Sequence, residues 1–231
     1  MTLLNISPFA ISRWGAFFNH FDLFFKGFLY TLGISFGALL LALILGILSG
    51  GLSTSKSKVG KLISRIYVEV FQNTPLLVQM VFVYYGLAII SNGHVMISAF
   101  FTAVLCVGLY HGAYISEVIR SGIEAVPKGQ TEAALVQGFT ANQTMQLIIL
   151  PQAVRTILPP MTNQVVNLIK NTSTVAIISG ADIMFVAKAW AYDTTNYIPA
   201  FAGAAIFYFV ICFPLASWAR KQEELNKKTY S

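Results

Sequence analysis

Uncharged apolar stretches alternate with short polar segments along most of this chain. Residues 27–55 contain no Asp, Glu, Lys or Arg, and neither do residues 70–116. One crossing of a bilayer by an α-helix takes about 20 apolar residues. The first stretch therefore predicts one membrane-spanning helix, and the second, about twice the length that one crossing requires, predicts two.

Two further apolar runs lie towards the C-terminus, and the first of them contains Pro159, Pro160 and the single charge of Lys170. The turn residues Ser91–Gly93 divide the long uncharged stretch into two. The pattern thus predicts an all-α integral membrane protein with five transmembrane helices. We place them at about residues 27–50, 68–90, 96–116, 152–178 and 197–218.

The composition agrees with a membrane protein. Hydrophobic residues make up 56% of the chain and charged residues 10%, with a mean hydropathy of +0.68, whereas a soluble domain has about 25% charged residues. The net charge of +6 would suit nucleic acid, but the basic residues lie between apolar runs and not on a soluble scaffold, so no nucleic-acid partner is expected. Cys106 and Cys212 lie within apolar runs and predict neither a disulfide nor a metal site.

The basic residues predict the orientation, because cytoplasmic loops collect Lys and Arg. Most of the fifteen lie in three segments that five spans place on one side: Lys56, Lys58, Lys61 and Arg65; Arg120, Lys128 and Arg155; Arg220, Lys221, Lys227 and Lys228. We therefore expect residues 1–26 to be an external N-terminal segment, with an interfacial position as the alternative. Residues 27–219 form the transmembrane domain, and residues 220–231 a cytoplasmic basic tail.

Small residues recur about every fourth position along the first predicted span, at Gly33, Gly37, Ala42, Gly46 and Gly50. Small side chains on one helix face let a second helix approach closely. The first span is therefore predicted to pack tightly against another helix.

A loop of about residues 117–150 separates the third and fourth spans and is long for a plain connection. Pro127 and Gly129 are expected to break the preceding segment. Residues 130–137 are rich in good helix formers, and Gly138 suits the end of a helix.

A second short helix is predicted immediately after Gly138. Thr140 and Gln143 have the spacing of a capping box, and the helix would run to Leu150 before Pro151 opens the fourth span. Two short helices joined at Gly138 make a bent element that fits a groove on a partner. An amphipathic segment lying on the lipid surface is the alternative.

This loop carries a resemblance to a known family. Glu132, Ala133, Ala134 and Gly138, followed by Ile149, Leu150 and Pro151, are similar to the EAA loop of permease subunits of ABC importers. The wider sequence resembles the polar amino acid importers at Tyr114–Arg120, Val126–Gln130, Leu150–Ala153, Arg155, Lys170–Ser173 and Asn73–Gln79. A Gly is more usual where Asn73 stands.

The resemblance implies a type I importer core with five helices per subunit, located in the bacterial inner membrane. It also implies a second permease subunit, two cytoplasmic ATPases, and an external binding protein or domain. In that family the EAA loop is the coupling helix, so the ATPase contacts would include Glu132, Ala133 and Ala134, with Gly138 permitting the bend. The chain contains no GxxxxGK[ST] phosphate loop. We therefore expect no catalytic residues and no cofactor here, with ATP and Mg bound by the partner ATPase.

Polar residues follow one face of the fourth predicted span. Asn163, Asn167, Lys170 and Thr174 are spaced four, three and four apart, with Ser173 beside them. Ionisable groups at membrane depth usually face a cavity, so Lys170 is a candidate anchor for a substrate carboxylate. The alternatives are that Lys170 extends to the outer interface or pairs with a carboxylate of the partner subunit.

Three more residues are candidates for the same pocket. His111 and Tyr114 lie on the third predicted span, and Gln79 lies on the second. A role in helix packing is the alternative for each of them.

These features predict the permease subunit of an ATP-driven amino acid importer that works by alternating access. The polar stripe contains no acid, which favours a polar neutral substrate such as glutamine, or cystine, over a cationic one. The particular amino acid, a homodimer or heterodimer, and the form of the binding protein stay open. The alternatives are a passive channel and a membrane-embedded hydrolase; for the latter, Gly33–Phe36 reads GISF and lacks the GxSG pattern.

Overall fold

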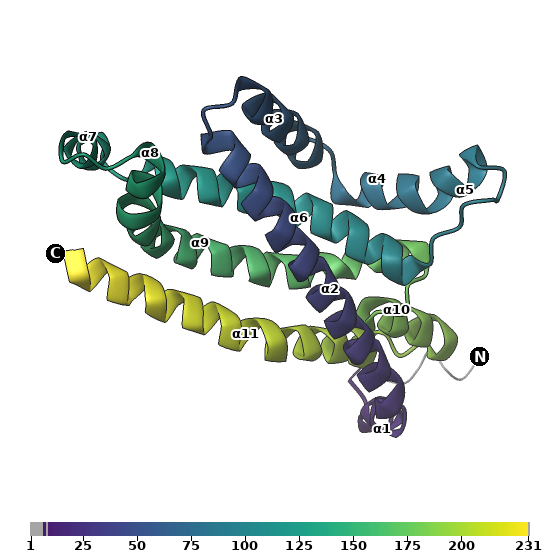
Figure 1. Ribbon diagram of the computed structural model, residues 1–231. Coiled ribbons are helices and arrows are strands. Elements are labelled where there is room, and N and C mark those ends of the chain that lie inside the picture. The colour runs from purple at the N-terminus through teal and green to yellow at the C-terminus, as the bar shows by residue number, and fades with distance from the viewer. Residues whose placement is uncertain (1–6, 8, 231) are drawn as a thin grey trace. The chain divides into compact units, whose positions relative to one another are not determined.

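Every regular element in the described part of the chain is helical (Figure 1). The computed structural model describes residue 7 and residues 9–230. Residues 1–6 and 8 of the predicted N-terminal segment, and residue 231 of the predicted tail, lie outside the described residues, as do the side chains of Lys227 and Lys228.

The helices vary widely in length. The long ones are α2 (Phe21–Thr54), α3 (Lys58–Gln72), α6 (Ala99–Glu124), α9 (Leu150–Asn171), α10 (Ile183–Thr194) and α11 (Tyr197–Tyr230). The short ones are α1 (Ile11–Asn19), α4 (Leu76–Val81), α5 (Leu87–Ile90), α7 (Lys128–Val136) and α8 (Ala141–Gln143). Two stretches are π-helical, Phe82–Gly86 and Thr144–Ile149, and Thr172–Ile178 is a 3₁₀ helix.

Within the described residues, three helical segments are long and apolar enough to cross a membrane: Phe21–Thr54, Ala99–Glu124 and Tyr197–Lys221. Two pairs of helices that are bent at a short break raise the number to five if each pair is one span. The predicted spans fall on these elements, and the number of crossings stays a prediction.

Local chemistry explains why the observed helix ends differ from the predicted ones. The helix that contains the first predicted span extends to Thr54, and the Ser53 hydroxyl caps its end by donating to the Gly50 carbonyl oxygen at 2.7 Å. The second predicted span is interrupted after Gln72, because Pro75 disfavours a helical conformation at Thr74.

The chain forms two compact units. The first comprises the described residues of Met1–Ala38 together with Leu76–Val107 and Leu168–Pro214. The second comprises Leu39–Pro75, Gly108–Asn167 and the described residues of Leu215–Ser231.

Aromatic residues dominate the core of the first unit. The core is formed by Phe17, Phe24, Ile183, Val186, Ala187, Trp190, Ala191, Ala200 and Ala204. The Phe24 ring meets the Phe17 ring edge-on at 4.7 Å and the Trp190 ring at 5.5 Å between centroids. The guanidinium of Arg13 donates to the Thr195 carbonyl oxygen at 2.8 Å, which ties α1 to the turn after α10. Aromatic packing and this bond together fix α1 against the rest of the unit.

Buried hydroxyls hold the second unit together. The Ser116 hydroxyl donates to Ser49 at 2.9 Å, and the hydroxyls of Ser49 and Ser64 lie 2.8 Å apart. These three residues join α2, α3 and α6. The Tyr67 hydroxyl donates to the Leu109 carbonyl oxygen at 2.7 Å, and the Gln72 amide donates to that of Ala113 at 3.2 Å. Amphipathic α3 is therefore fixed to α6 along its length.

The predicted tight packing of the small-residue stripe is confirmed in each unit. A side chain at Gly33 or Gly37 would crowd Phe100 or Val104 in the first unit. In the second unit, a Cβ at Gly46 would overlap Ile115, and one at Gly50 would lie 2.9 Å from Ile119. The four contacted side chains all belong to α6, so α6 is the partner of this stripe.

We expect Gly46→Val to destabilise the protein, because a Cβ at position 46 would overlap Ile115 and lie only 3.1 Å from the Gly112 carbonyl oxygen. Overpacking of this kind costs about 1–3 kcal/mol. The midpoint temperature of thermal unfolding, measured in detergent, should fall. Gly51→Val is the matched control on the same helix, because nothing lies within 4 Å of a Cβ there. Equal midpoints for the two variants would contradict the packing described above.

Candidate functional site

A complete C-terminal cap ends α7 at the predicted position. Gly138 has a φ of +89°, in the left-handed region that favours glycine. The Gly138 N–H donates to the Leu135 carbonyl oxygen and the Phe139 N–H to that of Ala134, both at 3.1 Å. This pair of bonds is a Schellman motif, which satisfies the last carbonyls and turns the chain sharply.

The predicted capping box at the start of the second short helix is confirmed. The Thr140 N–H donates to the Gln143 side-chain oxygen at 2.8 Å, and the Gln143 N–H donates to the Thr140 hydroxyl at 3.3 Å. The bend at Gly138 therefore has a defined cap on each side (Figure 1).

One detail of the predicted loop is wrong. Gly129 does not break the chain but lies within α7, whose N-cap residue is Pro127. Helix α9 begins at Leu150, so Pro151 lies in its first turn as predicted, and a π-helical turn at Thr144–Ile149 leads into α9 without a break. Proline lacks an N–H and cannot complete the usual bond four residues back, and a widened turn accommodates that loss.

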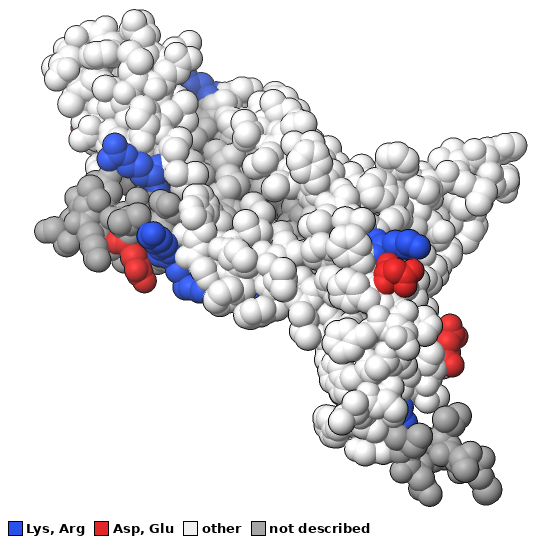
Figure 2. Space-filling view, turned by 90° about the horizontal axis from the view of Figure 1, so that it is seen from below, with Lys and Arg blue, Asp and Glu red and all other residues white. Residues whose placement is uncertain are grey.

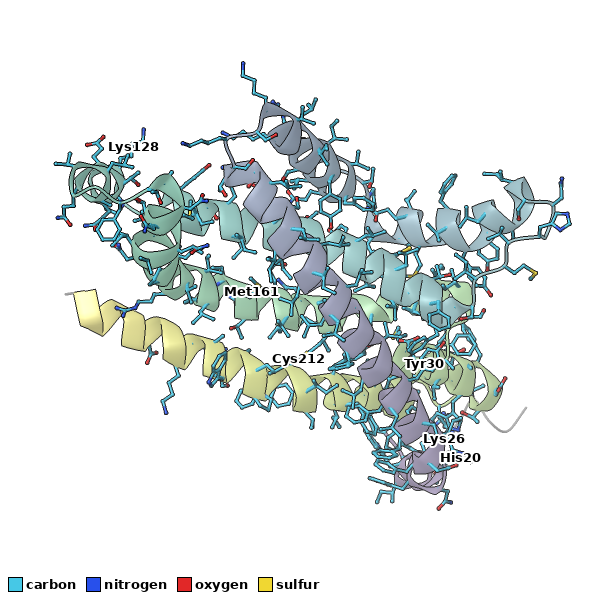
Figure 3. All side chains as sticks on the ribbon, in the orientation of Figure 1. His20, Lys26, Tyr30, Lys128, Met161 and Cys212 are labelled. Atoms are coloured by element: carbon cyan, nitrogen blue, oxygen red, sulfur yellow. The ribbon has the colours of Figure 1, made fainter. Side chains whose placement is uncertain are left out.

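Apolar and acidic side chains are exposed together on α7. Ala134 is buried, whereas Glu132 and Ala133 are exposed. Leu135 is 50% exposed and Val136 is 89% exposed. Lys128 marks the start of this helix in Figure 3. A rigid bend that presents apolar side chains beside a carboxylate is suited to docking in a groove.

The predicted polar stripe lies on α9 and the 3₁₀ helix that follows it, at exposed and half-buried positions. Asn163, Asn167 and Lys170 are exposed, and Ser173 and Thr174 are half-buried. Asn163 and Asn167 belong to the second unit and the other three to the first. Ser173 donates its hydroxyl proton to the Lys170 carbonyl oxygen at 2.8 Å, and Thr174 donates to that of Asn171 at 2.7 Å. Both hydroxyls are therefore arranged to act as acceptors.

Lys170 lines a cavity in the first unit with a volume of about 310 Å³. The lining residues are Lys170, Ser173, Met184, Phe201, Ala204, Ala205 and Tyr208. No acidic side chain of the described residues lies within ion-pair distance of the Lys170 ammonium. The cavity thus combines one uncompensated cation with mostly apolar walls, a composition that suits a small anionic group carried on an organic molecule.

A buried carboxylate supports one wall of this cavity. Asp182 is fully buried and accepts from the N–H groups of Met184 at 3.0 Å and Phe185 at 3.2 Å, which caps α10. The Tyr208 hydroxyl points to the same carboxylate at 3.5 Å. Asp182 therefore orients two lining residues, Met184 and Tyr208.

Lys170 and Ser173 are the candidates that line this cavity; Asn163, Asn167, Thr174 and the three remaining candidates do not. His111 is 2% exposed in the second unit and forms a side-chain hydrogen bond with Gln164. The Tyr114 hydroxyl lies 3.2 Å from that of Tyr110, also in the second unit. Gln79 belongs to the first unit and is half-buried on α4.

Sequence reasoning missed a charged cleft in the second unit. Its volume is about 450 Å³, and its lining residues are Ser53, Lys61, Ser64, Arg65, Val68, Glu69, Gln72, Asn73, Glu117 and Arg120. The Arg120 guanidinium binds both oxygens of Glu117, at 3.0 and 2.6 Å, and Glu124 at 2.7 Å. The spacing of these three residues on α6, three and four apart, is a signal that identifies the pairing from the sequence.

Comparison with known proteins identifies the family. Residues 42–224 match the family described as "Binding-protein-dependent transport system inner membrane component". The chain is 34% identical over 213 residues to the probable glutamine ABC transporter permease protein GlnM of Bacillus subtilis, a match that covers 92% of this chain and 97% of that protein. It is 36% identical over 200 residues to the probable amino-acid ABC transporter permease protein PatM of Vibrio harveyi, covering 85% and 89%.

Solved structures give the same answer. A chain in the crystal structure of an amino acid ABC transporter with histidines is 31% identical, with a TM-score of 0.84 and coverage of 91% of this chain and 97% of that one. A chain of the inward-facing MetNI methionine ABC transporter is 18% identical, with a TM-score of 0.66 and coverage of 88% and 98%, and that likeness concerns the fold alone. The resemblance found in the EAA loop is confirmed, and the chain belongs to the family of binding-protein-dependent transport system inner membrane components, which are permease subunits of ABC transporters.

Proposed function

We propose that this chain forms part of the translocation pathway of an ATP-driven amino acid importer and couples that pathway to cytoplasmic ATPases. The observation that carries the proposal is the doubly capped bend at Gly138, which is present in a chain of this family. A passive channel needs no rigid element that docks on another protein. The rigid bend at Gly138, in a chain of this family, therefore argues against a passive channel.

Coupling is proposed to run through α7. The exposed Glu132 and Ala133, together with Leu135 and Val136, contact a groove of the ATPase, while buried Ala134 packs α7 in place. ATP binding closes the two ATPases and draws the loops of two permease subunits together. The helices then rock between inward-open and outward-open states, and hydrolysis resets them. ATP and Mg are bound by the ATPases.

The proposed assembly follows from the family and from the charge pattern. It contains two ABC ATPases, a second permease subunit that is either a copy of this chain or a relative, and an extracytoplasmic binding protein or domain. The basic segments support a cytoplasmic coupling loop and C-terminus, with the N-terminus outside.

Lys170 is the proposed anchor for the substrate carboxylate. Its exposed ammonium lines the cavity of the first unit without an ion partner among the described residues. Ser173 lines the same cavity, and its hydroxyl proton points to a backbone oxygen, so it offers an acceptor for the substrate ammonium. Thr174, which does not line that cavity, is proposed as a second acceptor. Asn163, Asn167, Tyr114, His111 and Gln79 are proposed as further contacts along the pathway. Relatives named as glutamine permeases support a polar neutral substrate.

The direct test is the rate of ATP hydrolysis by the reconstituted complex in the presence of its binding protein, screened across the amino acids. One polar amino acid, or a small group of them, should stimulate hydrolysis. Absence of stimulation by every amino acid would contradict the proposed function.

Replacing Gly138 by Val should uncouple ATP hydrolysis from uptake. A β-branched residue at a φ of +89° is strained by about 1–2 kcal/mol or more, so the bend would change shape. Hydrolysis and uptake are measured in the same proteoliposomes. Gly129→Val is the matched control on α7, because Gly129 has an ordinary helical φ and nothing within 4 Å of a Cβ there. Normal uptake by a normally assembled Gly138 variant would remove the coupling role.

Replacing Lys170 by Met should abolish uptake while the complex still assembles. Loss of a charge-assisted hydrogen bond of about 1.5–3 kcal/mol predicts a 10- to 100-fold weaker substrate affinity. Affinity is measured by binding of radiolabelled substrate to the purified complex. Lys188→Met, which removes an exposed lysine from α10 of the same unit, is the control. Unchanged affinity in the Lys170 variant would exclude it from the site.

A further inference from the structure

Helix α3 has three distinct faces, all described within the second unit. Gly60, Ser64 and Val68 are buried and face the helices that α3 packs against. Most of the remaining circumference is exposed and carries an apolar stripe and a basic row, and exposed Glu69 follows the row four residues after Arg65.

The apolar stripe is long and has no neighbour within its unit that covers it. It consists of Val59, Leu62, Ile63, Ile66 and Val70, which are 67%, 57%, 56%, 55% and 51% exposed. These residues recur at spacings of three and four and therefore share one face. In a membrane protein, a face of this kind is covered by lipid chains or by another subunit.

The basic row runs beside this stripe. Lys58, Lys61 and Arg65 are spaced three and four apart, and all are exposed. No carboxylate of the described residues lies within ion-pair distance of their charged groups. Arg120 in the same unit, by contrast, holds Glu117 and Glu124. Glu69 and Glu117 line the same cleft as Lys61 and Arg65, but neither forms an ion pair with the row. The three basic residues therefore keep a net positive charge.

Two other exposed apolar faces among the described residues, one on α2 and one on α11, lack such a row. Exposed Phe36, Leu40 and Ile44 on α2, and exposed Ile206 and Phe209 on α11, lie in uncharged stretches of sequence. The acyl chains of any lipid can cover those faces, because the faces offer only hydrocarbon contact. On α3, the apolar stripe beside the basic row favours a molecule that has both a hydrocarbon chain and a negative charge.

We propose that α3 binds an anionic phospholipid, with the headgroup phosphate on Lys58, Lys61 and Arg65 and an acyl chain along Leu62 and Ile66. Basic clusters beside membrane helices attract anionic headgroups in this way. A second copy of the chain is a poorer occupant, because two identical basic rows brought together by a twofold axis repel each other.

The position of α3 gives the bound lipid a route to the coupling loop. Tyr67 and Gln72 hydrogen-bond to backbone oxygens of α6, and the Ser64 hydroxyl meets that of Ser49. Helix α6 ends at Glu124, and α7 begins at Lys128. A lipid that holds α3 in place therefore stabilises the helix that leads into the proposed coupling loop.

The test is direct lipid binding to the full-length chain, purified in its complex and analysed by native mass spectrometry with phosphatidylglycerol or phosphatidylcholine. The combined variant K58Q/K61Q/R65Q should bind phosphatidylglycerol roughly 100-fold more weakly, because each basic residue near an anionic surface contributes about a fivefold factor. The variant K26Q/K188Q/K221Q is the control, because it removes the same charge from exposed lysines on α2, α10 and α11. Its affinity for phosphatidylglycerol should match that of the unmodified protein.

A second variant tests the apolar half of the site. Leu62→Gln/Ile66→Gln should weaken binding of long-chain phosphatidylglycerol while the basic row remains intact. Equal affinity for the two lipids in the unmodified protein, or equal phosphatidylglycerol affinity in the basic-row variant and the control, would overturn the proposal. So would an efficient disulfide between two copies carrying Leu62→Cys, which would show that a second chain covers this face. The binding measurements need no transport activity, so their outcome is independent of the proposed function.

Discussion

The need to satisfy every backbone hydrogen bond within the chain constrains this fold most strongly. Hydrocarbon offers no partner for N–H and C=O groups, so an apolar chain of this kind crosses a bilayer as helices. Where the helices pack most closely, side-chain donors supplement the backbone pattern: the Tyr67 hydroxyl reaches the Leu109 carbonyl oxygen, and the Gln72 amide reaches that of Ala113. The close approach of α3 to α6 depends on Gly112, where a Cβ would lie 2.5 Å from the Tyr67 hydroxyl oxygen.

The same constraint explains how a bent loop becomes a rigid one. Helix ends leave carbonyl and N–H groups without partners. At Gly138 the Schellman bonds satisfy the end of α7, and at Thr140 the capping box satisfies the start of α8. The two short helices are therefore joined by a turn with few alternative conformations. The proposed role in coupling requires a loop that resists bending, and this turn supplies that resistance through local bonds.

The sequence pattern predicted the helical fold, the tight packing of the small-residue stripe against another helix, and both caps of the loop. Each of these depends on residues that are close in the chain or on a simple periodicity. The pattern did not predict that the helix begun at Ala141 continues past Pro151, since the widened turn at Thr144–Ile149 has no strong sequence signature. We also did not predict that a helix ends at Gln72 within the second predicted span, although Pro75 is a signal for that end. For the candidate site, the exposure of Lys170 followed from its polar face, but its cavity depends on residues from α10 and α11 that no local pattern joins.

The basic side chains of this protein fall into two groups, those that are paired with carboxylates of the same chain and those that are not. Arg120 is held by two carboxylates on its own helix, so its charge is already neutralised within the fold. Lys170, Lys61 and Arg65 line cavities and form no ion pair with a carboxylate of the described residues, although Glu69 and Glu117 line the same cleft as Lys61 and Arg65. An exposed cation near hydrocarbon keeps its charge only with water or an anion nearby. The uncompensated positions are therefore the ones at which the two proposed ligands of opposite charge would be stabilised, an amino acid carboxylate in one unit and a lipid phosphate in the other.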